Sequence, residues 1–193
     1  MPPLVEVTFD QKKLDSIARQ FKDMPSALPR IVSRGINRTA TSSKAEITRE
    51  LAAEISLKQK RIRAGLNLKK ATRNMWQAVI WVNEKRIKLI HFAARALKGK
   101  GVSYKIDKRS GRKKIIEPPT SAFIQTMPNS GHVGVFRRAT AARGSMYELF
   151  GPSLGEVFEG AAGIAEKMQR SSGEKLEKNI DSQIAYTLSK MKR

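Results

Sequence analysis

The sequence predicts an α+β fold with long N-terminal helices, a central antiparallel β-meander that carries a basic hairpin, and a C-terminal helix. Apolar residues recur at helical spacing up to about residue 70, and helical spacing returns over 150–191. Between these parts, over 75–137, short apolar and β-branched runs alternate with turn residues. Helices followed by a group of strands are typical of α+β proteins. At this length we expect a single domain, residues 1–193, of which 1–70 is mainly helical.

The composition narrows the class of protein. An apolar content of 40% and two tryptophans argue against global disorder. The longest apolar stretches, such as 78–82, are far too short to span a bilayer, so we expect no membrane partner. The N-terminus shows no basic region and no long apolar run, so no secretory signal is visible. The absence of cysteine excludes disulfides and thiolate chemistry, and it fits a reducing cytoplasm.

The N-terminal part is expected to begin with a strand and two helices. Residues 4–9 alternate in the manner of a short strand, and Asp10 caps a first helix with apolar positions up to Phe21. A longer helix is predicted over about 27–55, capped by Ser26, and it would be roughly 40 Å long. That length suggests a packing surface beyond one small core. The apolar stripe of this helix consists of Leu28, Ile31, Val32, Ile36, Thr39, Ala40, Ile47, Leu51 and Ile55.

The long helix is expected to have possible bends and to be followed by a short helix. Gly35 and the polar run 39–43 are the points at which the long helix could bend. A further short basic helix, capped by Ser56, is expected through Leu66.

The middle of the chain reads as strands. Residues 76–82 form a near-continuous apolar and β-branched run that predicts a buried strand, with 87–92 as its hairpin partner. The alternating segment 102–106 predicts a strand, and the apolar pair 115–116 predicts its partner. The loop between them contains Gly111, so the two strands are expected to form a second hairpin. Two more short strands are predicted at the positions 122–127 and 132–137.

The C-terminal part is predicted to be helical again. Ser153 and Glu156 fit a capping box at its start, and Ser171-Ser172-Gly173 is expected to kink or interrupt the helix. The apolar stripe of the last helix consists of Leu176, Ile180, Ile184, Leu188 and Met191, of which the first four are predicted to be buried.

Positive charge is concentrated in one segment. Residues 58–114 hold 19 Lys and Arg and only two acids, a net of +17, whereas the whole chain carries +21. Concentrated like charge works against compactness, so we expect a partner that supplies negative charge. Nucleic acid, an acidic protein surface and anionic lipid are the candidates.

Two groups of cations are the candidate contact residues for nucleic acid or an acidic partner. The first group shares the tip of the second hairpin: Lys108, Arg109, Arg112, Lys113 and Lys114. The second group lies before the strands: Lys58, Lys60, Arg61, Arg63, Lys69, Lys70 and Arg73. Aromatic residues are sparse around both groups, so any nucleic-acid contact should be to the backbone and independent of sequence. The alternative for the hairpin is a solubilising loop or a contact with an acidic neighbouring protein.

Catalysis has little support. His91 and His132 have no acid nearby in the sequence, and no P-loop, nucleophile elbow or zinc-protease motif is present. Glu46, Glu50 and Glu54 recur at i, i+4, i+8, which could hold a divalent metal but is more typical of a solvated helix face. We therefore expect no enzyme activity, no catalytic residue, no metal and no cofactor.

Several motifs occur in a characteristic order over most of the chain. They are 27–40 with its Ile36-Asn37-Arg38-Thr39-Ala40 pattern, the basic stretch 58–72, the segments 94–95, 100–104, 121–124 and 134–138, and 148–153 before the last helical part. In this order and spacing the chain resembles the minor tail protein Z family of long-tailed bacteriophages, which are tail completion proteins. None of the motifs is catalytic, and the resemblance identifies no DNA-binding residue.

The resemblance implies a structural virion protein at the head-proximal end of the tail, assembled in the host cytoplasm. Such a protein finishes the tail and helps form the head–tail joint. It implies several copies around the tail axis, and we expect a ring of six. The expected partners are these copies, tail terminator or tail tube proteins, head connector proteins and the packaged DNA end.

Two other functions stay open on the sequence. The first is a free, sequence-independent nucleic-acid-binding protein, which would bind duplex or RNA tightly as a lone chain. The second is a metal-dependent nuclease, which would need Glu46, Glu50 and Glu54.

Overall fold

The computed structural model of the chain describes residues 4–8, 17–19, 27–98, 101–116, 121–140, 145–161 and 163–191. Residues 17–19 are helical, while Asp10, Phe21 and Ser26, on which parts of the N-terminal prediction rest, lie outside the described residues. The elements in chain order are β1 (Val5–Thr8), α2 (Ala27–Glu54), α3 (Gln59–Gly65), β2 (Leu66–Lys69), β3 (Gln77–Val82), η1 (Leu89–His91), β4 (Arg95–Ala96), β5 (Val102–Tyr104), β6 (Lys113–Ile115), β7 (Phe123–Thr126), β8 (Val133–Arg138), β9 (Met146–Glu148), α4 (Leu154–Gly160) and α5 (Ile164–Met191). The predicted α+β class is confirmed, with three small antiparallel sheets.

The chain divides into two compact units. Unit 1 consists of residues 1–48, 63–82 and 162–193, and unit 2 of residues 49–62 and 83–161. The expectation of a single domain stays a prediction.

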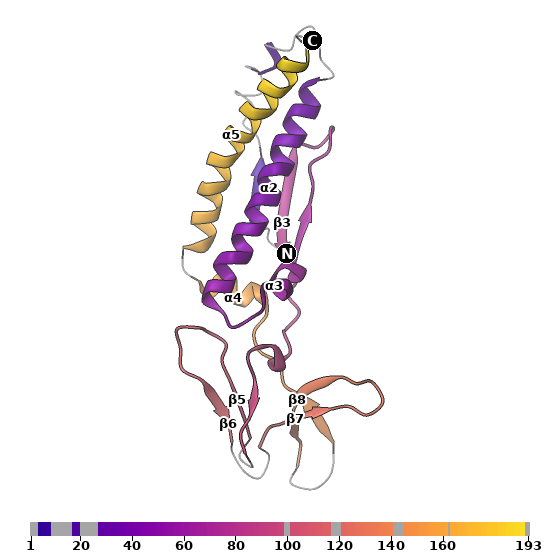
Figure 1. Cartoon of the computed structure of the whole chain (residues 1–193), viewed down its shortest axis with the longest axis vertical. Helices are drawn as coiled ribbons and strands as arrows, with labels where there is room; N and C mark the ends of the chain where they lie inside the picture. The colour runs from indigo at the N-terminus through magenta and orange to yellow at the C-terminus, as the bar shows by residue number, and fades with distance from the viewer. Residues whose placement is uncertain are drawn as a thin grey trace. The chain divides into compact units, whose positions relative to one another are not determined.

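Unit 1 combines a three-stranded sheet with two long helices. The sheet has the order β1-β3-β2, and both pairings are antiparallel. Val5, Val7, Ala78 and Ile80 are buried, because alternate side chains of a strand point to one face. Helix α2 lies beside β3 and beside α5 (Figure 1). The Asn37 side chain forms two hydrogen bonds with the backbone of Ala71, shortly after β2.

Helices α2 and α5 meet through polar as well as apolar side chains. Asn179 Nδ2 donates to Thr39 Oγ1 at 2.9 Å, and the hydroxyls of Ser43 and Ser172 hydrogen-bond at 2.7 Å. The two helices are antiparallel, because the later residue of α2 contacts the earlier residue of α5. The polar run 39–43, expected as a possible bend, therefore lies inside one uninterrupted helix and contacts α5.

The predicted apolar stripe of α5 is buried only in its first half. Leu176 and Ile180 are 7% and 3% exposed, and Ile180 packs onto Gly35, where a β-carbon would collide with its Cδ1 atom. Ile184 is half-buried and Leu188 is 37% exposed, so the prediction of burial was wrong for these two residues. Beyond Ile180 the facing residues of the two helices are mostly polar or cationic and line a cavity, so the close apolar packing seen at Gly35 and Ile180 does not continue.

Unit 2 contains two small sheets, with the orders β4-β5-β6 and β7-β8-β9. Phe92 is fully buried at its centre, with Val102 and Val135 also buried. Gly151 lies against the Phe92 ring so closely that a β-carbon would meet Cε2 at 2.5 Å. This contact explains a glycine directly after the half-exposed Phe150.

Most of the predicted strands and turns are confirmed, including the strand at 5–8, the 102–115 hairpin and the strands at 123–126 and 133–138. The prediction that 87–92 pairs with 76–82 was wrong. Strands β1 and β2 pair with the two edges of β3. The sequence did not predict β2. Residues 87–92 instead bond to 149–152 and contain η1.

The C-terminal helical part begins where the sequence predicted, but it is interrupted at a different position. Ser153 and Glu156 form the expected capping box, with both reciprocal hydrogen bonds present. The interruption lies before α5, near Gly163 with its φ of 79°, and not at 171–173. Ser172 is buried against α2, which favours an unbroken helix there.

Candidate functional site

The basic hairpin joins β5 to β6, and its turn is built on one carboxylate. Asp107 Oδ1 accepts a hydrogen bond from the backbone N–H of Arg109 at 2.7 Å, and Oδ2 accepts one from the Ser110 hydroxyl at 2.8 Å. These hydrogen bonds, the backbone one foremost, lower the pKa of Asp107 because they favour its charged form. Lys108 and Arg109 therefore lie in an ordered turn, whereas Lys113 and Lys114 lie on strand β6, so the five predicted cations do not share one hairpin tip.

Two of these cations hold the hairpin to the last turn of α2. The Lys108 backbone N–H donates to the Glu54 carbonyl at 2.7 Å, and its ammonium donates to the Ala52 carbonyl at 2.5 Å. Arg109 Nη2 lies 2.6 Å from Glu54 Oε1. Helix α2 has no basic residue of its own in its last turn. Lys108 thus provides the cation that the carbonyl end of a helix favours.

Arg112 also serves the fold of unit 2. Its Nη2 atom donates to the carbonyls of Ala93 at 2.7 Å and Ser103 at 3.1 Å, and to the Ser103 hydroxyl at 3.1 Å. Ala93 has a positive φ of 49°, which is unfavourable for a residue with a β-carbon. Arg112 therefore ties this strained turn to β5.

Lys113 and Lys114 differ from the other three cations. They stand opposite Tyr104 and Ser103 on β6, an edge strand of its sheet, and adjacent residues of a strand face opposite sides. Both are exposed, and neither side chain has a hydrogen bond or ion pair in the part of the chain that the structure describes. They are the hairpin cations most available to a partner.

The second predicted group is exposed throughout: Lys58, Lys60, Arg61, Arg63, Lys69, Lys70 and Arg73. Lys60, Arg61 and Arg63 project from the short helix α3, whose buried residue is Ile62. Among the described residues, no side chain of this group forms an ion pair. Lys58, Lys60 and Arg61 belong to unit 2, and the other four residues belong to unit 1. We call these seven residues, which are neighbours in the sequence, the α3 cluster.

The three glutamates of α2 are divided between other contacts. Glu46 forms an ion pair with Lys175 and accepts a hydrogen bond from the Ser171 hydroxyl, while Glu54 pairs with Arg109. Over the described residues, no group of three potential metal-binding side chains comes together.

The sequence missed a polar group in unit 2 that surrounds Glu148 on β9. Glu148 is 15% exposed, and its two oxygens lie 3.1 Å from Lys88 Nζ and 2.8 Å from His132 Nε2. Nearby, burial lowers the pKa of His91, with further contributions from the positive charges of Arg61 and Lys88. The acid beside His132 is 16 positions away in the sequence, so the absence of an acid among the sequence neighbours did not reveal this contact. Sequence spacing carries no signal for this group, because tertiary structure brings together residues that are far apart in the chain.

Comparison with known proteins decides the family. The model of the family described as prophage minor tail protein Z (GPZ) matches residues 12–193. The chain belongs to this family. A search of curated proteins and a search of solved structures each found no match.

Membership of the minor tail protein Z family makes the chain a structural protein of a phage tail and a component of the virion. A structural family of this kind suggests a protein without enzymatic function. No described helix combines the length and the apolar character needed to cross a membrane.

Proposed function

We propose that this member of the minor tail protein Z family completes the phage tail at its head-proximal end and helps to form the head–tail joint. In this proposal several copies, six in number, form a ring around the tail axis. The ring contacts tail terminator or tail tube proteins on one side and head connector proteins on the other. Membership of the family supports a place in the tail, and head-to-tail contacts between identical subunits form a ring when the rotation between subunits closes.

The observation that carries the functional part of the proposal is the set of unpaired exposed cations. Lys113, Lys114 and the α3 cluster have no ion pair among the described residues. Self-repulsion among such charges is relieved when a negatively charged partner binds. We propose that the packaged DNA end is this partner, and that the contact is to phosphates without reading of bases.

The rival partner is an acidic ring of a neighbouring tail or connector protein. Phosphate contact and acidic-protein contact need the same positive charge, so assembly and DNA binding must be measured on the same variants. A Lys113→Ser/Lys114→Ser variant serves this purpose because neither side chain supports the fold through a described contact.

The test combines a cryo-EM map of assembled tails with native mass spectrometry of the tails and of the purified protein. The proposal expects a ring at the head-proximal end, with the β5–β6 hairpins towards the channel. It expects the serine variant to enter tails normally and to bind duplex DNA more weakly. A strict monomer in intact tails contradicts the ring, and failed assembly with unchanged DNA binding supports the acidic-protein partner.

A further inference from the structure

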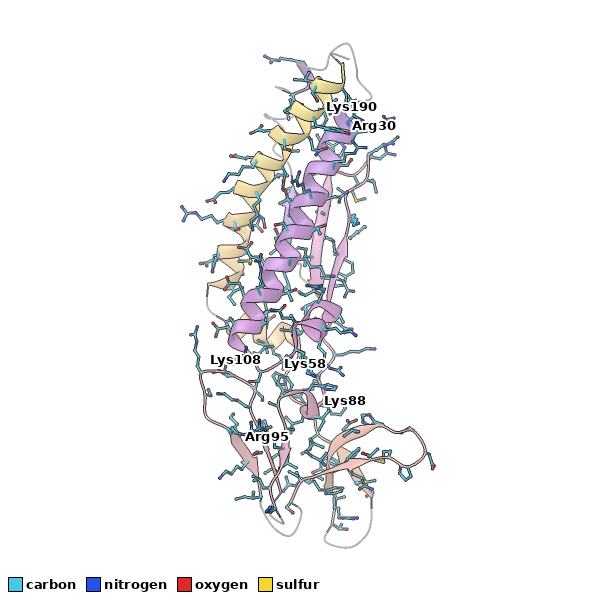
Figure 2. All side chains as sticks on the ribbon, viewed as in Figure 1. Arg30, Lys58, Lys88, Arg95, Lys108 and Lys190 are labelled. Atoms are coloured by element: carbon cyan, nitrogen blue, oxygen red, sulfur yellow. The ribbon has the colours of Figure 1, made fainter. Side chains whose placement is uncertain are left out.

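A cavity opens in unit 1 where the N-terminal end of α2 lies beside the C-terminal end of α5. Its volume is about 260 Å³. On the α2 side it is lined by Ala27, Arg30, Ile31 and Arg34, which recur at i, i+3, i+4 and i+7 and therefore share one helix face. Figure 2 shows the labelled Arg30 and Lys190 close together at this end of the two helices.

The α5 side of the cavity follows the same spacing. Gln183, Tyr186, Thr187 and Lys190 line it at i, i+3, i+4 and i+7. The two faces continue the antiparallel contact of α2 with α5, which at Ile180 is still apolar and tightly packed. Side chains at such facing positions are usually apolar. Here most of them are polar or cationic, and they leave a cavity.

The charge of the cavity is one-sided. Arg30, Arg34 and Lys190 contribute three cations, and none of the described lining residues carries a carboxylate. Helix α2 has no acidic residue in its first turn that would offset the positive end of the helix. The Lys190 ammonium lies 5.0 Å from the centre of the Tyr186 ring. A hydrogen bond from Lys190, followed by the charges of Lys190 and Arg34, lowers the pKa of Tyr186.

The arrangement has a second, apolar component. Ala27 and Ile31 are 7% and 2% exposed and form an apolar part of the lining, while the Tyr186 ring is 48% exposed. An exposed aromatic ring is a stacking surface for a planar base. The volume is close to the lower end of ligand cavities, roughly 300 Å³, so there is room for more than an inorganic anion.

We propose that this cavity binds a nucleoside monophosphate, either free or as the phosphorylated end of a nucleic-acid strand. Arg30, Arg34 and Lys190 hold the phosphate, and Tyr186 with the apolar lining accepts the base. Arginine forks bind phosphate through paired hydrogen bonds. A phosphate monoester, with a charge of about −1.5 to −2 at neutral pH, matches three cations better than a single carboxylate does. The proposal is independent of tail completion, because it uses none of the cations assigned to the DNA end.

The test is a titration of the isotope-labelled full chain with deoxyadenosine monophosphate, followed by NMR at about 0.15 M salt, where non-specific surface binding is screened. We expect saturable shifts of the backbone amides at 27–34 and 183–190. Arg34→Gln/Lys190→Gln should weaken binding at least about tenfold, the scale expected when charge-assisted hydrogen bonds are lost. The matched control, Arg38→Gln/Lys178→Gln, removes one exposed cation from each of the same helices outside the cavity lining and should change the affinity less than about twofold.

Further probes separate the sources of the phosphate. Tighter binding of a 5′-phosphorylated oligonucleotide than of the mononucleotide would identify a strand end as the ligand, whereas tighter binding of the mononucleotide would identify the free nucleotide. Three results would overturn the proposal. They are equal effects of the two double variants, equal shifts from deoxyadenosine without phosphate, and equally tight binding of a glutamate-rich peptide in this cavity. None of these results would bear on tail completion.

Discussion

The Lys108 ammonium donates a hydrogen bond to the carbonyl oxygen of Ala52, in the last turn of α2, at 2.5 Å. A hairpin residue thus satisfies a helix end that is 56 positions earlier in the chain. The carbonyls of a last helical turn have no partner within the helix, and a cation beside them also interacts favourably with the helix dipole. Part of the charge in the basic segment therefore stabilises the fold of unit 2.

We expect Lys108→Met to lower the free energy of unfolding by about 0.5–1.5 kcal/mol, because it removes this hydrogen bond and its charge. Urea denaturation followed by circular dichroism measures the change. Lys113→Met is the control, since its side chain is exposed and has no described partner, and it should cost less than about 0.5 kcal/mol. Equal effects of the two changes would show that the Lys108–Ala52 contact does not stabilise the fold.

The two isoleucines of α5 should differ in their contribution to stability. Ile180 is 3% exposed, so Ile180→Ala should cost about 2–4 kcal/mol. Ile184 is only half-buried, and Ile184→Ala should cost about 1 kcal/mol. Denaturant midpoints of both variants measure the difference. A loss at Ile184 as large as that at Ile180 would mean that an assembly partner or another part of the chain buries it.

Close approach of α2 and α5 at Gly35 predicts a coupled pair. A β-carbon at Gly35 would collide with Ile180 Cδ1 and lie 3.0 Å from its Cγ1. Gly35→Ala should therefore cost about 1–3 kcal/mol. Ile180→Val deletes the colliding methyl group, so the double variant should be more stable than the sum of the single changes predicts. Strict additivity in this double-mutant cycle would place the two residues out of contact.

Acidification should destabilise the protein through His91. Burial foremost, and then the charges of Arg61 and Lys88, lower its pKa from 6.5 in the folded state. The unfolded chain therefore binds a proton that the folded chain does not as the pH falls below 6.5, and the free energy of unfolding decreases over that window. This contribution is fully present above pH 6.5 and is lost as the pH approaches the lower folded pKa. Urea midpoints between about pH 7.5 and 5.5, on both sides of the ordinary histidine pKa, should show this fall, and His91→Asn should reduce it. An unchanged slope in that variant would exclude His91 as the cause.

The salt dependence of DNA binding should depend on the unpaired cations. If Lys113 and Lys114 both contact phosphates, Lys113→Ser/Lys114→Ser should reduce the log–log salt slope for duplex binding by roughly 2. One full phosphate contact contributes roughly 0.9 to the salt slope. Replacing Arg109, whose side chain already pairs with Glu54, should reduce the slope by less than that amount. Fluorescence anisotropy with two unrelated duplex sequences also tests the expected sequence independence. A slope unaffected by the double change would exclude these lysines from the contact.

Local patterns in the sequence were sufficient for many elements of this protein. Helical spacing predicts α2, strand alternation predicts β1 and the β5–β6 hairpin, and Ser153 with Glu156 predicts the start of α4. These features depend on neighbours within a few positions, so the residues themselves specify them. The excess of positive charge and the motif order that indicates the family are likewise properties of the sequence.

Tertiary structure decided which residues meet across the chain. It gave β3 its two partners, divided the hairpin cations into those that hold the fold and the unpaired Lys113 and Lys114, and gathered Lys88 and His132 around Glu148. It also ended the apolar contact of α5 after Ile180, where facing cations line a cavity. The charge and spacing of residues in the sequence show only which kinds of contact a side chain is able to form. Its actual partner depends on which distant segment folding brings within hydrogen-bonding distance, and the spacing of residues along the chain does not encode that choice.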